Sequence, residues 1–141
     1  MLKTKTLLAT LALGIAFAGP AFAEKMKATL DGKSETPPNA SAGKGTADID
    51  YDAATKKLSW KVTYSGLTGP ATMAHFHGPA APGVNAPPVV PVPMSALANP
   101  MTGTATLTDA QIADLEAGKW YFNIHTAAHP GGEIRGQLPA K

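Results

Sequence analysis

From residue 26 onward, apolar and polar residues alternate along several short segments, which is the pattern of half-buried β-strands. The alternation is clearest over 46–51 and 58–64, and the polar segment 52–57 separates these two stretches. We therefore expect the two stretches to form a β-hairpin. Further strands are expected over 26–30, 71–77, 102–107, 120–125 and 133–138, with an edge strand, limited by its prolines, over 89–92.

One short helix is expected among these strands. Thr108 and Gln111 have the spacing of a capping box, and Gly118 stands where a glycine commonly ends a helix. The Pro- and Gly-rich stretch 78–88 predicts a long loop. About seven short strands with a single helix are typical of an all-β, antiparallel β-sandwich with Greek-key-like connections, with a barrel as the alternative.

The first 23 residues have the parts of a cleavable secretory signal peptide. Two lysines near the start precede an apolar run over 7–17, and Ala-Phe-Ala follows at 21–23. Cleavage after this triplet leaves residues 24–141, the size of one domain, in the periplasm or outside the cell. The apolar run is shorter than the roughly 20 residues that span a bilayer, so no membrane span is expected after cleavage.

Charge and cysteine content narrow the classes of partner. The chain has 12 Lys and Arg residues against 10 Asp and Glu residues, but two of the lysines belong to the signal, so the mature domain is neutral. A neutral domain without a basic cluster gives no reason to expect nucleic acid as a partner. Because the chain has no cysteine, packing alone, or packing with a bound metal ion, must stabilise the domain.

All four histidines of the chain fall into two short clusters, each beside a Gly/Pro turn. In the first cluster, His75 and His77 alternate with Phe76 on a predicted strand. They therefore share one face with Met73, while Phe76 points into the core. The Cα atoms of His75 and His77 are then roughly 6 to 7 Å apart, so both imidazoles can reach one ion.

The second cluster is His125 and His129. The core side of its strand consists of Trp120, Phe122 and Ile124, which places His125 on the opposite face. His129 follows in a loop. If the two histidine-bearing strands are neighbours, the four imidazoles can form one metal site.

Copper is the preferred ion for such a site, and zinc is the less favoured one. Imidazole suits both metals, but an exported site without thiols depends on imidazole, with a thioether from Met73, Met94 or Met101 as a further ligand. The alternative is that the histidines donate hydrogen bonds to turn carbonyls and bind nothing.

Near the C-terminus, Glu133 and Arg135 share one face of a predicted strand. One interpretation makes either residue a hydrogen-bond partner that orients the imidazole of His125 or His129. The other interpretation is an ordinary solvent-exposed strand face, where charge pairs contribute little.

Three longer segments resemble the CHRD domain, which is named from chordin. They are Ala-His-Phe-His-Gly-Pro at 74–79, Leu-Glu-Ala-Gly-Lys-Trp-Tyr-Phe-Asn-Ile-His-Thr at 115–126, and Pro-Gly-Gly-Glu-Ile-Arg-Gly-Gln-Leu at 130–138. The resemblance extends to 30–32 and 35–38 near the start of the domain. It implies a β-rich, extracytoplasmic protein and includes the following residues: His75, His77, His125, Glu133 and Arg135.

Three functions are compatible with these features. The first is an exported protein that binds copper for storage, delivery or protection. The second is a non-enzymatic interaction module of the cell envelope, with a protein partner and structural histidines. The third is a copper-dependent enzyme, because a His-x-His strand pair distantly resembles copper-zinc superoxide dismutase, although the cysteines of that family and an evident zinc subsite are missing.

Overall fold

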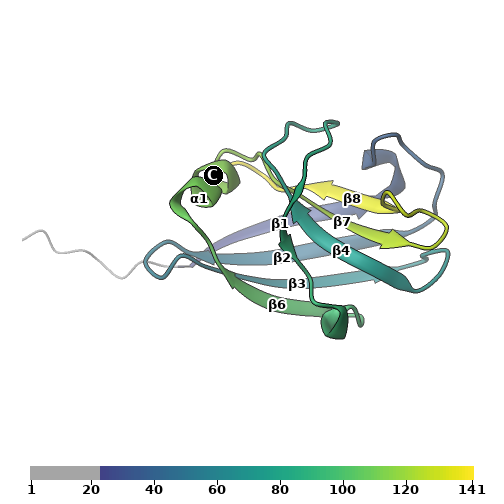
Figure 1. The fold of residues 1–141 in the computed structure, drawn as a ribbon, viewed down its shortest axis with the longest axis horizontal. Helices are drawn as coiled ribbons and strands as arrows, with labels where there is room; N and C mark the ends of the chain where they lie inside the picture. The colour runs from purple at the N-terminus through teal and green to yellow at the C-terminus, as the bar shows by residue number, and fades with distance from the viewer. Residues whose placement is uncertain (1–22) are drawn as a thin grey trace, which may run out of the picture.

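The computed structural model describes residues 23–141, so the predicted signal over 1–23 lies outside the described residues except for its last position. Eight strands account for most of the regular structure (Figure 1). They are β1 (Glu24–Asp31), β2 (Lys44–Asp52), β3 (Lys57–Ser65), β4 (Ala71–His77), β5 (Pro88–Pro91), β6 (Met101–Thr106), β7 (Tyr121–Thr126) and β8 (Ile134–Gln137).

The strands form one antiparallel sheet in the order β5-β4-β7-β8-β1-β2-β3-β6. Each expected strand lies within one or two residues of an observed one. The predicted hairpin is confirmed, because β2 and β3 pair along their whole length from Lys44 opposite Ser65 to Asp52 opposite Lys57. The proline-limited strand β5 lies at one edge of the sheet, as its sequence predicts.

The helix α1 (Asp109–Glu116) begins and ends where its capping residues predict. The Thr108 side chain accepts a hydrogen bond from the Gln111 amide, and the Gln111 side chain accepts one from the Thr108 amide. Gly118 follows the helix with φ of 70°, a left-handed conformation that favours glycine. None of the helices within residues 23–141 has the length and apolarity needed to cross a membrane.

The sheet folds over on itself between β8 and β1, so that β5-β4-β7-β8 covers β1-β2-β3-β6 (Figure 1). Trp60 on β3 and Phe76 on β4 meet across the interior with ring centroids 5.3 Å apart. The chain crosses between the layers after β3, after β5 and through α1. The architecture is the expected antiparallel sandwich, nearly closed into a barrel.

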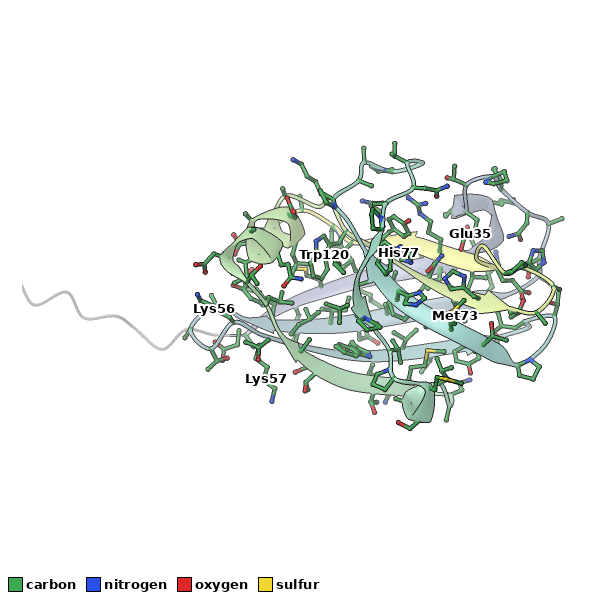
Figure 2. The ribbon with its side chains drawn as sticks, viewed as in Figure 1. Glu35, Lys56, Lys57, Met73, His77 and Trp120 are labelled. Carbon is green, nitrogen blue, oxygen red and sulfur yellow. The ribbon has the colours of Figure 1, made fainter. Side chains whose placement is uncertain are left out.

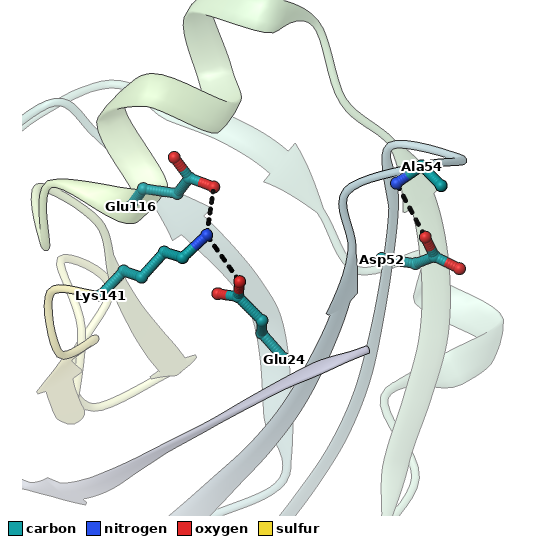
Figure 3. Close-up of polar contacts among 5 residues, drawn as sticks. All are labelled: Glu24, Asp52, Ala54, Glu116 and Lys141. Carbon is teal, nitrogen blue, oxygen red and sulfur yellow. Dashed lines mark hydrogen bonds and ion pairs between the residues drawn. The ribbon is translucent and has the colours of Figure 1, made fainter. Parts of the chain in front are cut away.

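Ionic contacts at the surface join Lys141 to strand β1 and to the helix. The ammonium group of Lys141 lies 2.6 Å from a carboxylate oxygen of Glu24 on β1 and 3.4 Å from one of Glu116 on α1 (Figure 3). In the β2–β3 turn, Asp52 accepts a hydrogen bond from the amide of Ala54 (Figure 3). Such exposed pairs stabilise a fold only slightly, so the interior must supply most of the stability.

Strand β7 is buried on both faces, which its alternating sequence does not predict. Trp120, just before the strand, and the β7 residues Phe122 and Ile124 lie in the main core, as expected. Asn123 and His125, on the opposite face, are also buried. The expectation that this second face is simply a non-core face is therefore incomplete, because another part of the chain covers it.

The Pro- and Gly-rich loop over 78–87 covers part of this face, around Tyr121 and Arg135. The Arg135 guanidinium donates hydrogen bonds to the Val84 carbonyl and the Asn85 side chain, and the Tyr121 hydroxyl donates to the Ala86 carbonyl. Because Arg135 is 1% exposed, the solvent-exposed interpretation of its strand face is wrong. The loop thus creates a buried polar layer on the outside of β4, β7 and β8.

Candidate metal site

Three histidines from two adjacent strands meet in this buried polar layer. Strand β4 contributes His75 and His77, and the neighbouring strand β7 contributes His125. One ligand nitrogen from each imidazole lies within 4.8 Å of the others. Nδ1 of His75 and Nε2 of His125 are 3.3 Å apart, which is about the separation of two nitrogens bound 2.0 to 2.1 Å from a tetrahedral ion.

Backbone carbonyls orient two of the three rings. Nδ1 of His125 lies 2.8 Å from the carbonyl oxygen of Pro130, and Nδ1 of His77 lies 2.8 Å from that of Ala86. Because a carbonyl oxygen only accepts, each Nδ1 carries the proton of its neutral ring. The Nε2 atom of His125, which faces His75, is then the nitrogen available to a metal ion, the arrangement commonly found around metal-binding histidines.

Aromatic and polar neighbours hold the ring of His77, which is labelled in Figure 2, in place. Tyr121 stacks on it with ring centroids 4.7 Å apart and an interplanar angle of 2°. The guanidinium carbon of Arg135 lies 3.4 Å from the centre of the same Tyr121 ring. Nε2 of His77 also lies 3.0 Å from the side-chain oxygen Oδ1 of Asn123. Because Oδ1 only accepts hydrogen bonds, binding of a metal ion at Nε2 of His77 requires the Asn123 side chain to turn away.

The surroundings of the cluster favour neutral imidazoles. Burial lowers the pKa of His75 below its ordinary value, and the adjacent His125 and His77 lower it further. Burial also lowers the pKa of His77, and this effect outweighs the hydrogen bonds to Ala86 and Asn123 that raise it. Neutral imidazole is the form that binds metal ions, so the cluster is suited to binding near neutral pH.

Two of the residues considered as ligands or ligand partners lie elsewhere. His129 is outside the group of His75, His77 and His125, and its backbone forms the turn after β7 through hydrogen bonds with Thr126. Glu133 accepts hydrogen bonds from Ser41, Thr68 and Thr126.

The prediction that Glu133 or Arg135 orients His125 or His129 is therefore corrected. Glu133 binds hydroxyl and amide donors at the junction of several loops. Arg135 reaches the cluster only through Tyr121, and the Pro130 carbonyl orients His125. Sequence spacing does not reveal such backbone partners, since every residue other than proline carries both a backbone donor and an acceptor.

The family model of the CHRD domain matches residues 26–138. The chain belongs to the CHRD domain family. The match covers nearly all of the described residues and includes the three clustered histidines. No curated protein and no solved structure matches this CHRD domain. Family membership thus leaves the chemistry of the domain to be argued from its own residues.

The CHRD domain also contains a buried carboxylate that sequence analysis missed. Glu35 is 5% exposed, and its Oε1 atom has no hydrogen-bond partner among residues 23–141. Burial raises the pKa of Glu35 to about 7, against the opposing effects of Arg135 and Asn123. Gly132 permits this packing, because a Cβ there would collide with Glu35 Oε1 and Asn123 Nδ2. The sequence feature that could have pointed to Glu35 was the Glu-Thr-Pro-Pro motif at 35–38.

We expect the Glu35→Gln variant to become more stable relative to the wild type as pH rises. The raised pKa means that Glu35 favours folding below its ordinary pKa, and that this contribution is lost as pH increases through about 7. Between pH 5 and pH 8 the difference in unfolding free energy should move in favour of Glu35→Gln by about 2 to 3 kcal/mol.

Urea unfolding at the two pH values measures this shift. Glu116→Gln is the matched control, because Glu116 is partly exposed at the end of α1 and makes only a surface ion pair. Because exposed ion pairs contribute little to stability, its difference from the wild type should be small. A pH-independent difference for Glu35→Gln would show that Glu35 is ionised and solvated in the folded protein.

Proposed function

We propose that this CHRD-domain protein is exported and binds one transition metal ion, preferably copper, through His75, His77 and His125. The observation that carries the proposal is the convergence of three imidazole nitrogens within 4.8 Å on adjacent strands. Storage, delivery or protection against the free ion are the roles that fit a binding site of this kind.

The arrangement supports binding because little reorganisation is needed. Two rings are already fixed by the carbonyls of Ala86 and Pro130, and His77 is additionally stacked on Tyr121. The rigid sheet supplies all three ligands, so the entropy of ordering long loops is not lost on binding. A ligand set held in this way binds more tightly than the same residues on a flexible segment.

Copper is preferred on chemical grounds. At a given nitrogen site, Cu²⁺ binds more tightly than Zn²⁺ and the other common divalent ions of the first transition row. His77 and His125 are buried, whereas His75 is half-buried, so one side of the cluster remains open to an incoming ion. The N-terminal sequence supports export, which would place this site in contact with metal ions outside the cytoplasm.

We expect the purified protein to bind one equivalent of Cu²⁺, and His75→Ala or His125→Ala to lower its affinity at least about 100-fold. This loss is larger than the 10- to 100-fold that removal of an outer partner costs, because a direct ligand is removed. Competition against a chromophoric chelator measures the affinity, and elemental analysis after dialysis measures the stoichiometry.

His129→Ala is the matched control, since His129 lies in the turn after β7 and outside the cluster. It should bind copper like the wild type. Circular dichroism confirms that each variant is folded. Negligible copper and zinc on the wild-type protein would contradict the proposal, and so would an equal loss of affinity in His129→Ala and His125→Ala.

A further inference from the structure

Three imidazoles do not by themselves distinguish copper from zinc, because imidazole binds both metals. A fourth ligand decides the selectivity of such a site. The sequence offers three methionines near the relevant segments, and the fold separates them clearly. Met101 is fully buried in the core, Met94 is 83% exposed in the short 3₁₀-helix over 94–96, and Met73 lies on β4.

Met73 is placed beside the histidine cluster by the pairing of β4 with β7. Its direct cross-strand partner is His125, and paired residues have Cβ atoms about 4.5 to 5.5 Å apart. It also precedes His75 by two positions on β4, so both side chains lie on the same face of the strand. Met73 is thus a neighbour of two of the three proposed ligands.

Met73 is a large apolar side chain that the core of the domain does not cover. It is 45% exposed, one of three large exposed hydrophobic residues in the part of the chain that the structure describes. The pairing of β4 with β7 shifts its register between Ala71 and Met73, and irregularities of this kind often redirect a side chain. Three rotatable bonds then allow the thioether to reach the open side of the cluster.

We propose that Met73 supplies a thioether ligand that completes a three-imidazole, one-thioether site selective for Cu(I). The inference rests on the proposed function, because it requires the histidines to bind the ion. Soft thioether sulfur binds Cu(I) well, whereas Zn²⁺ favours nitrogen, oxygen and thiolate ligands. Met73 therefore contributes to the binding of Cu(I) and little to that of Zn²⁺.

The test compares Met73→Leu with the wild type and with Met94→Leu, an exposed methionine away from the His125 pairing. Cu(I) affinity is measured anaerobically by competition with a chromophoric Cu(I) chelator, and Zn²⁺ affinity is measured in parallel. Leucine keeps the size and apolar character of methionine, so folding should be preserved. X-ray absorption of the Cu(I)-loaded protein reports whether sulfur is bound.

We expect Met73→Leu to lose at least about tenfold in Cu(I) affinity and to change Zn²⁺ affinity by less than about threefold. Met94→Leu should match the wild type for both ions, and the absorption spectrum should lose its sulfur contribution only in Met73→Leu. If the wild-type protein binds metal through its histidines but Met73→Leu keeps the same Cu(I) affinity, this inference is overturned while the proposed function stands. A wild-type protein that binds no metal would instead refute the proposed function.

Discussion

Replacing Glu133 by glutamine is expected to lower the free energy of unfolding by about 3 kcal/mol at neutral pH. The carboxylate is fully buried and accepts four hydrogen bonds, from the Ser41 hydroxyl, the Thr68 amide and hydroxyl, and the Thr126 hydroxyl. These donors come from segments that precede β2, precede β4 and end β7. An amide in place of the carboxylate leaves part of this donor set without an acceptor.

The loss of stability in Glu133→Gln should become smaller as the pH falls. Burial alone raises the pKa of Glu133, but the hydrogen bonds from Ser41, Thr126 and Thr68 outweigh it and lower the pKa to about 2. The stabilisation is therefore present above the ordinary pKa of a glutamate and is lost as pH falls toward 2.

Chemical denaturation at pH 7 and at pH 2.5 checks this prediction. The difference between wild type and Glu133→Gln should be largest at pH 7 and should shrink at pH 2.5. Glu116→Gln, at the surface end of α1, should cost little at either pH. A cost below about 0.5 kcal/mol for Glu133→Gln at pH 7 would mean that water replaces the observed donors.

The second large effect is expected at the centre of the sandwich. Phe76→Ala should lower the free energy of unfolding by about 3 to 5 kcal/mol. Phe76 is fully buried, and its ring contacts Trp60 across the interior, as well as Trp120 and Phe122 on its own side. Truncation therefore removes apolar contacts from both layers and leaves a cavity between them.

The conservative variant Phe76→Leu separates the effect of the lost buried volume from the effect of the lost aromatic contacts. Leucine fills most of the space, so this variant should lose less than half as much stability as Phe76→Ala. Thermal and urea unfolding measure both variants. Equal losses in the two variants would indicate that the aromatic contacts, rather than the buried volume, hold the layers together.

Much of the fold follows from local patterns. Period-two alternation locates the strands because each has one face in the main core, and the capping residues Thr108 and Gly118 locate the helix. The buried polar layer on the outside of β4, β7 and β8 was not predictable from such local patterns. Asn123 and His125 have the polar character of a solvent-exposed face, and the groups that cover them, such as Glu35 beside Asn123, are distant in sequence.

The candidate site was predictable only in part. The period of a strand places His75 and His77 on one face, but the position of His125 depends on register. Because β4 and β7 pair directly, with Met73 opposite His125, the ring of His125 reaches that of His75. His129 follows in a turn whose geometry no periodic pattern specifies.

Crystals of the copper-loaded protein would test the central claim most directly, through anomalous diffraction at the copper absorption edge. The proposed function predicts one strong peak, about 2 Å from a ring nitrogen of each of His75, His77 and His125. A peak bound elsewhere, at His129 for example, or the lack of any peak at the cluster in copper-loaded crystals, would contradict it.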